Sequence, residues 1–198
     1  SPRAADLSAH IARGAGLTTA AEAVSSESPP LPGDVRLDAE VRAAAAHDFG
    51  NLIHKQPRGV MRPASGADIA SLMRWAKSKG VKVAARGQGH SIYGRALAED
   101  GIVVDMGAMT GIGDIRPDRV VVDAGATWRD LLDATLAQGL TPPVLTNYLG
   151  LSVGGTIAVG GIGATSSRHG MQTDNVISLD VVTGDGRELS CSAAEHPD

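Results

Sequence analysis

Two glycine-rich segments are the features that most restrict how this chain can fold. The first runs from Arg86 to Gly94 and follows an apolar stretch typical of a buried strand; the second runs from Ser152 to Gly163 and contains two glycine doublets. Glycine at this density destabilises a regular helix or strand, but it permits positive φ and lets a ligand or another backbone approach closely. Backbone N–H groups in such turns, or at the start of a helix, can bind phosphate oxygens. We therefore expect both segments to press against a ligand.

Each segment also has a simpler interpretation. A Gly-x-Gly turn alone is often only a tight turn, and glycine doublets alone can mark a flexible connector. The dinucleotide fingerprint G-x-G-x-x-G does not fit the first segment, because position 92 is Ile and no amphipathic helix begins directly after it. In the second segment, the intervening Val, Ile and Leu residues look buried, which favours a short helix or packed loop over a connector.

Helices and strands are expected to alternate along the chain. Capping patterns predict one helix from Ser65 to Gly80 and another from Thr127 to Gly139. A third, Ala-rich helix is expected over 38–46, with Asp38 as its N-cap. Strands are expected over 59–62, 81–85, 102–105 and 119–124, with a hairpin over 176–183 and 187–190. This alternation predicts an α+β fold or an α/β sandwich.

The N-terminal end is expected to differ from the rest of the chain. Residues 1–33 are rich in Ala and Ser and end in a proline-rich run, which predicts a leader or flexible linker with at most a weak helix over 6–15. The ordered domain is expected over 34–198. Because the sequence stops directly after the hairpin, we expect this chain to be a fragment.

Composition argues against several functional classes. The net charge is −4, whereas a nucleic-acid binder needs a basic face. Cys191 is the only cysteine, so an intrachain disulfide is excluded. No histidine forms an i, i+4 pair with an acidic partner and no Gly-x-Ser-x-Gly elbow occurs, which argues against a zinc site and a hydrolase. No apolar run is long enough for a membrane span, so we expect a soluble protein, either cytoplasmic or exported with its leader removed.

Four stretches together carry a resemblance to a known family: residues 84–91, 147–155, 168–170 and 180–186. From about His47 to its end, the chain resembles the FAD-binding domain of the vanillyl-alcohol-oxidase, or PCMH-type, flavoproteins. Within them it is most similar to cytokinin dehydrogenases and their bacterial relatives. The resemblance implies two small α/β subdomains packed together, incomplete at the C-terminal end, with the substrate domain absent from this chain.

The resemblance also implies which residues hold the cofactor FAD. The family's Gly-His-Ser matches Gly89-His90-Ser91, so His90 is the expected covalent attachment site. Ala85, Gly87, Gly89 and Ser91 correspond to positions that wrap the pyrophosphate, largely through backbone groups. The other expected cofactor positions are Arg86, Gln88, Arg95, Asn147, Ser152, Gly154, Gly155, Ala158 and Ile162.

Three positions depart from the family pattern. Asn147 stands where cytokinin dehydrogenases have an aspartate that hydrogen-bonds the substrate amine and helps to remove its proton. Asn147 is the candidate catalytic residue, but an amide cannot take up a proton at neutral pH. Arg95 replaces a glutamine that touches the cofactor, and Ala158 replaces a serine.

The expected function is an FAD-dependent oxidoreductase that, at full length, oxidises a C–N bond of N6-substituted adenines. Two alternatives stay open: an alcohol or carbohydrate oxidase of the same fold, and a non-catalytic flavin-binding fragment. The expected partners are a small-molecule substrate and the protein's own C-terminal substrate domain, with no metal, nucleic acid or membrane.

Four further side chains have two possible roles each. Trp75 and Trp128 are expected to pack rather than to stack on a ligand. Tyr148 is expected either to line the pocket or to pack. Arg86 either offsets phosphate charge or is a solvated loop arginine.

Overall fold

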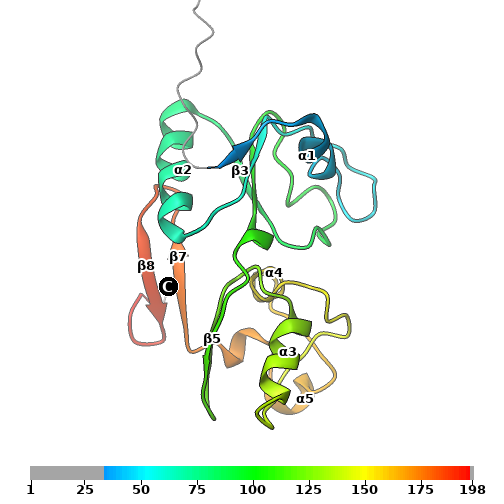
Figure 1. The fold of residues 1–198 in the computed structure, drawn as a ribbon, viewed down its shortest axis with the longest axis vertical. Coiled ribbons are helices and arrows are strands. Elements are labelled where there is room, and N and C mark those ends of the chain that lie inside the picture. Colours follow the sequence, from blue (N-terminus) through cyan, green and yellow to red (C-terminus); the bar gives the residue numbers. More distant parts are fainter. Residues whose placement is uncertain (1–33, 197–198) are drawn as a thin grey trace, which may run out of the picture.

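A computed structural model describes residues 34–196 of the chain. The leader expected over 1–33, with its weak helix, lies outside the described residues. The described part contains two small α/β units and a C-terminal hairpin that lies along the first unit (Figure 1).

The first unit is built on a four-stranded sheet in the order β1-β2-β4-β3. Strands β2 (Gly59–Met61), β4 (Ile102–Asp105) and β3 (Val83–Arg86) run parallel, and β1 (Val35–Arg36) joins β2 antiparallel. The carboxyl ends of the parallel strands therefore meet at one edge, where ligands commonly bind in such sheets.

Two apolar clusters cover the two faces of this sheet, because successive side chains of a strand point to opposite sides. Val60 and Val103 pack with Ala45 and Ala98 on the side of α1 (Ala39–Ala44). The neighbouring strand residues pack on the side of α2 (Gly66–Lys79), in a cluster formed by Met61, Leu72, Ile102 and Val104. Trp75 packs against this second cluster, as predicted.

The predicted helix caps are found at α2 but not at α1. Ser65 Oγ accepts the backbone N–H of Asp68 at 3.3 Å, and Gly80 ends the helix at φ +65°. Asp38 precedes α1, but its side chain makes no capping bond, so that part of the prediction is wrong. Its carbonyl oxygen accepts the backbone N–H of Arg42 instead.

The second unit packs a two-stranded ribbon against short helices. The core consists of Trp128, Leu131 and Val153, with surrounding apolar residues. The indole Nε1 of Trp128 donates to Thr156 Oγ1 at 2.8 Å, so Trp128 is a packing residue, as expected. The elements are η1 (Met106–Ala108), β5 (Ile112–Ile115), β6 (Val120–Val122), α3 (Trp128–Leu136), α4 (Val153–Ile157), α5 (Ser166–His169) and η2 (Thr173–Asn175).

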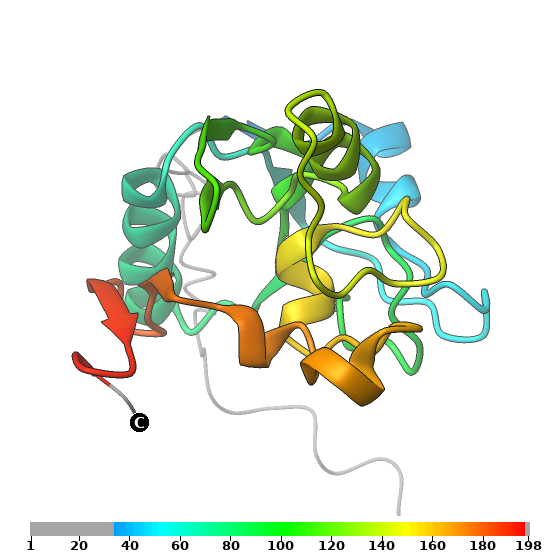
Figure 2. The ribbon, with the colours of Figure 1, turned by 90° about the horizontal axis from the view of Figure 1, so that it is seen from below.

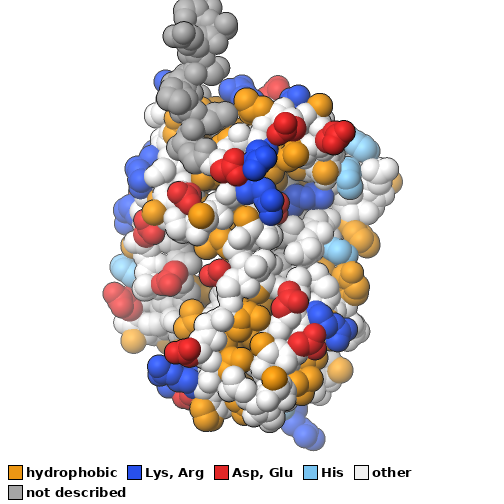
Figure 3. Space-filling view, in the orientation of Figure 1, with side chains coloured by type: hydrophobic (Ala, Val, Ile, Leu, Met, Phe, Trp, Pro, Cys, Tyr) orange, Lys and Arg blue, Asp and Glu red, His pale blue; other side chains and the backbone are white. Residues whose placement is uncertain are grey.

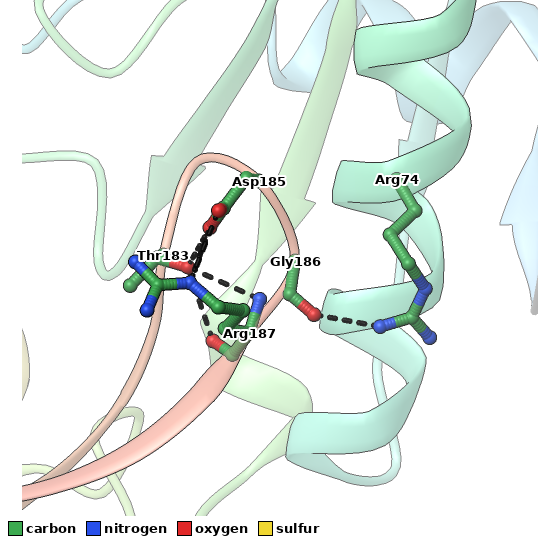
Figure 4. A network of polar contacts seen from close by, with 5 residues as sticks. All are labelled: Arg74, Thr183, Asp185, Gly186 and Arg187. Carbon is green, nitrogen blue, oxygen red and sulfur yellow. Dashed lines mark hydrogen bonds and ion pairs between the residues drawn. The ribbon is translucent and has the colours of Figure 1, made fainter.

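The C-terminal hairpin, β7 (Ser178–Val182) and β8 (Glu188–Ser192), returns the chain to the first unit. Its turn docks on α2, where Arg74 Nη1 donates to the carbonyl oxygen of Gly186 at 2.6 Å (Figure 4). Gly186 has φ +79°, and a Cβ there would lie 2.6 Å from the carbonyl oxygen of Ala70. Only glycine therefore fits this turn against the helix.

The mixed fold of two small α/β units agrees with the prediction. Strand β3 extends to Arg86, one residue further than expected, and β6 is shorter than the predicted 119–124. Strands β1 and β5 were not predicted from the sequence. Figure 2 shows the two units from below, with the hairpin beside α2 at the left and α4 towards the middle of the view.

Candidate functional site

The two glycine-rich segments meet beside the carboxyl end of β3. Gly87 follows β3 directly, and a Cβ placed on it would lie only 2.1 Å from Ser152 Oγ. Ser152 is 3% exposed and forms an isolated β-bridge with Thr127. The close approach of the first segment to Ser152 thus depends on the missing side chain of Gly87.

The second segment is fixed to the loop between β6 and α3. The backbone N–H groups of Val153 and Gly154 donate to the carbonyl oxygens of Ala126 and Ala124 at 2.8 and 2.9 Å. A Cβ on Gly154 would lie 2.6 Å from the Cβ of Ala124. The expectation of free N–H groups at this helix start is therefore wrong for these two residues, because nearby carbonyls already accept their hydrogen bonds.

The first segment, by contrast, carries a run of free backbone donors. Within residues 34–196, the N–H groups of residues 88–92 have no protein acceptor. Gly89 has φ +74°, a conformation that other residues rarely adopt. Successive donors of this kind suit an anionic group such as a diphosphate, so this chain fits the expected cofactor at this position.

The imidazole of His90 lies between two aromatic rings. It stacks on Phe49, with ring centroids 4.5 Å apart and ring planes 22° apart. The ring of Tyr148, from the second segment, is 5.2 Å away and tilted by 37°. His90 Nδ1 is 3.1 Å from the carbonyl oxygen of Gln88. The half-buried imidazole thus lies where the two segments meet, as the sequence interpretation requires.

Tyr148 and Asn147 lie on the exposed side of this junction. Tyr148 is 58% exposed, so it lines the site next to His90 rather than the core. Asn147 is also exposed, and its amide makes no hydrogen bond to other residues of the described part. Its side chain is therefore available to a ligand.

Arg86 has a role that the sequence did not indicate. Its guanidinium donates to the carbonyl oxygens of His47 at 3.0 Å and Ala44 at 3.4 Å, at the end of α1. Burial lowers its pKa, and the nearby Asp105 carboxylate partly opposes that effect. Arg86 is thus not a solvated loop arginine, because it joins the end of α1 to the first segment; its contact with a phosphate stays a prediction.

The other expected cofactor positions are divided between two places. Arg95 and Ala85 line a shallow depression at the free edge of β3, together with Lys55 and Lys82. Gly155, Ala158 and Ile162 follow one another along the second segment and its helix. Ile162 is 71% exposed and Val159 is 77% exposed, so the expectation that the apolar residues of this segment are buried is wrong for these two. Gln88 and Ser91 are exposed beside His90.

Sequence reasoning missed Asp48 and Phe49, which precede the first segment by about forty residues. Asp48 is 3% exposed, and its carboxylate accepts the backbone N–H groups of Leu52, Ile53 and Tyr93 at 2.9, 3.2 and 3.0 Å. Burial tends to raise the pKa of this carboxyl, but the backbone hydrogen bonds outweigh it and lower the pKa. No local pattern marks either residue, because their partners are distant in sequence.

Two other kinds of site find no support in the part of the chain that the structure covers. Among residues 34–196 there is no group of three or more His, Cys, Asp or Glu side chains that could hold a metal ion, and no helix long and apolar enough to cross a membrane. Figure 3 shows acidic and basic side chains interspersed on one face of the molecule, with no continuous basic stripe there.

Comparisons with known proteins identify the family of this chain. Residues 57–192 match the family model of the FAD binding domain. An uncharacterised oxidoreductase from the fasciation locus of Rhodococcoides fascians is 46% identical over 77% of this chain and 35% of its own length. Cytokinin dehydrogenase 10 of rice (Oryza sativa subsp. japonica) is 46% identical over 80% of this chain and 31% of its own.

A solved structure shows the same arrangement. The crystal structure of 6-hydroxy-D-nicotine oxidase from Arthrobacter nicotinovorans superposes with a TM-score of 0.78 and 27% identity, covering 86% of this chain and 38% of that protein. The chain thus spans about a third of the length of the relatives that it matches.

Proposed function

The chain belongs to the FAD binding domain family, and from that premise we propose that it carries FAD covalently on His90 within a cytokinin dehydrogenase-like oxidoreductase. The observation that carries the proposal is the position of His90. Its imidazole lies at the junction of the two glycine-rich segments, beside five free backbone donors and between two aromatic rings. FAD bound in this way needs donors for its diphosphate close to the histidine that bonds to its ring system.

The residues of the chain have separable roles in this proposal. The N–H groups of residues 88–92 bind diphosphate oxygens, and the rings of Phe49 and Tyr148 flank the imidazole. When Nδ1 of His90 carries the ring proton, it donates to the Gln88 carbonyl and leaves the lone pair on Nε2. Bound FAD supplies the two-electron redox chemistry, while the protein supplies binding and orientation.

The tether requires a defined exchange of atoms and electrons. Attachment would join an imidazole nitrogen of His90 to a methyl carbon of the isoalloxazine ring, in place of one hydrogen. It would release one proton from the imidazole and one proton and two electrons from the flavin, so it would need a two-electron oxidant such as dioxygen. The neutral imidazole is the reactive form, because the protonated ring has no free lone pair.

Acid denaturation tests the covalent attachment. The complete protein that contains this chain is produced, precipitated with acid and washed, and the pellet is examined for flavin absorbance. We expect the colour to stay on the polypeptide, and to be lost in His90→Ala although that variant still binds FAD reversibly. Complete release of flavin from the unaltered protein would remove the covalent part of the proposal.

The proposed substrate class is N6-substituted adenines. Its test is anaerobic bleaching of the flavin by isopentenyladenine, with simple alcohols and oligosaccharides as the comparison panel. Bleaching by the adenine derivative alone supports the proposal.

Asn147 favours a second candidate, an alcohol or carbohydrate oxidase of the same fold. The exposed amide can accept a hydrogen bond from a substrate but cannot take up its proton at neutral pH. Bleaching by alcohols or oligosaccharides alone would favour this candidate. A gain of adenine-derivative turnover in Asn147→Asp would instead indicate a cytokinin-type enzyme that has lost its base.

A further inference from the structure

We infer that Phe49 and Asp48 are a positioning pair for His90: Phe49 holds the plane of the imidazole, and Asp48 holds Phe49 against the loop that carries it. The inference rests on the proposed attachment of FAD to His90. It adds two residues, from a segment outside both glycine-rich stretches, to the determinants of that reaction.

Phe49 contacts the His90 loop through both its ring and its backbone. The ring stacks on the imidazole at a centroid distance of 4.5 Å, and the backbone N–H of Phe49 donates to the carbonyl oxygen of Ser91 at 3.1 Å. Offset aromatic stacking favours one ring orientation over others. The side chain of Phe49 therefore restricts rotation of the imidazole, while its main chain sets the distance between the two loops.

The exposure of Phe49 argues against a simple packing role. The side chain is 61% exposed, and none of the described apolar cores contains it. A phenylalanine that served the core would be buried. Among the aromatic rings of residues 34–196, the ring of Phe49 stacks on that of His90 alone.

The carboxylate of Asp48 joins its own loop to the loop that carries His90. One carboxylate oxygen accepts the N–H groups of Leu52 and Ile53 within its own loop, and the other accepts the N–H of Tyr93, three residues after His90. Tyr93 and the following Gly94 have φ +60° and +66°, so the turn after His90 is tightly folded. A buried carboxylate that bridges these turns keeps Phe49 and His90 in register.

Replacement of Phe49 by Leu tests the inference in the complete protein. Apoprotein produced under riboflavin limitation is mixed with FAD, and the covalent adduct is followed by acid precipitation over time. Loss of a ring contact worth about 0.5–1.5 kcal/mol predicts attachment about two- to twelvefold slower in Phe49→Leu. Phe49→Tyr restores the rate because it keeps the stacked ring. Leu52→Ala, an exposed change in the same loop, leaves it unaltered.

Nuclear magnetic resonance of the FAD-free protein gives a second measurement that does not depend on attachment. A ring stacked on Phe49 has its carbon-bound protons shifted upfield, so the His90 signals move downfield in Phe49→Leu and stay near their original place in Phe49→Tyr. If Phe49→Leu does not fold, Phe49→Met removes the same ring from the exposed site.

The two measurements separate failure of the inference from failure of the proposed function. An unaltered attachment rate in folded Phe49→Leu, with attachment intact in the parent protein, would overturn the inference and leave the proposed function standing. If the parent protein forms no adduct, the proposed attachment of FAD fails. Whether Phe49 holds the imidazole of His90 is then decided by the His90 proton signals alone. Unshifted His90 signals in Phe49→Leu would overturn that role.

Discussion

At the residue scale, contacts between distant segments decide where the imidazole of His90 lies. The Gly-x-Gly-His pattern is local, so the sequence could indicate both the turn and His90 as the expected attachment residue. The contacts that orient the ring are not local: Asp48 and Tyr93 are 45 positions apart, and Phe49 reaches His90 over a similar separation. The same limit applies to Arg86, whose carbonyl partners, Ala44 at the end of α1 and His47 just after it, lie about forty residues earlier.

Replacing Gly87 by Ala is predicted to separate the two glycine-rich segments. The new Cβ would lie 2.1 Å from Ser152 Oγ and 3.3 Å from Ser152 Cβ, so the buried hydroxyl must rotate away and the two segments must separate slightly. We expect a loss of about 1–3 kcal/mol in the free energy of unfolding and weaker retention of FAD. Urea unfolding and flavin absorbance after gel filtration measure the two effects. Gly184→Ala, which has open space around it, is the matched control. Equal stability of both variants would argue against the close contact.

The carboxylate of Asp48 is predicted to make stability depend on acid. Its pKa is lowered in the folded state relative to about 3.9 in the unfolded chain, so the unfolded chain binds more protons below about pH 4. The stabilisation is therefore complete above about pH 4 and is lost as the pH falls through the folded pKa. Asp48→Asn should be less stable at neutral pH and should lose stability less steeply on acidification.

Urea unfolding at several values between about pH 3 and pH 7 measures this dependence. Asp118→Asn is the comparison variant, because the exposed Asp118 pairs only with the adjacent Arg119 and solvent screens that pair. A steeper or unchanged acid dependence in Asp48→Asn would contradict the assigned role of the carboxylate.

At the element scale, helices with local start signals were predictable and strands with distant partners were not. Ser65 and Thr127 cap α2 and α3 as expected, because a capping side chain bonds to an N–H only three residues away. Strand β5 contains Gly113 and Asp114, both poor strand formers, and it forms only by pairing with β6. Strand β1 has two residues and depends on β2, more than twenty positions later.

Docking of the β7–β8 hairpin on α2 is predicted to depend on Arg74. Arg74→Met removes the donor to the Gly186 carbonyl but keeps most of the aliphatic side chain. We expect a loss of about 1 kcal/mol and faster hydrogen exchange in β7 and β8, because this bond joins the hairpin turn to the helix. Lys77→Met, on the same helix, should leave exchange in the hairpin unchanged. Equal protection in the two variants would show that apolar packing alone holds the hairpin.

At the scale of the whole molecule, the chain corresponds to a cofactor-binding domain of larger oxidoreductases. It covers 35% and 31% of two oxidoreductase relatives, and the described part contains the junction around His90. The fold class could be predicted because alternating helices and strands are a sequence pattern, and the family resemblance implied that both glycine-rich segments hold one cofactor. The exposure of Ile162 could not be predicted, because it depends on how the surrounding helices and loops pack around it.

The isolated chain of residues 1–198 is predicted not to oxidise a substrate by itself. A site for the substrate requires walls on the open side of the junction, where Tyr148 and Asn147 are exposed. The measurement is dye reduction by the isolated chain, mixed with FAD and isopentenyladenine, against the complete protein as the positive control. Turnover by the isolated chain at a comparable rate would contradict this division of roles.

The most direct test of the central claim is to locate the flavin on the polypeptide. The complete protein is denatured and digested with a protease, and the fluorescent flavin-bearing peptide is sequenced by tandem mass spectrometry. We expect one flavin peptide, which contains residues 87–91 and carries the modification on His90. A flavin found on any other residue, or the absence of a flavin peptide from freshly purified yellow protein, would contradict that claim.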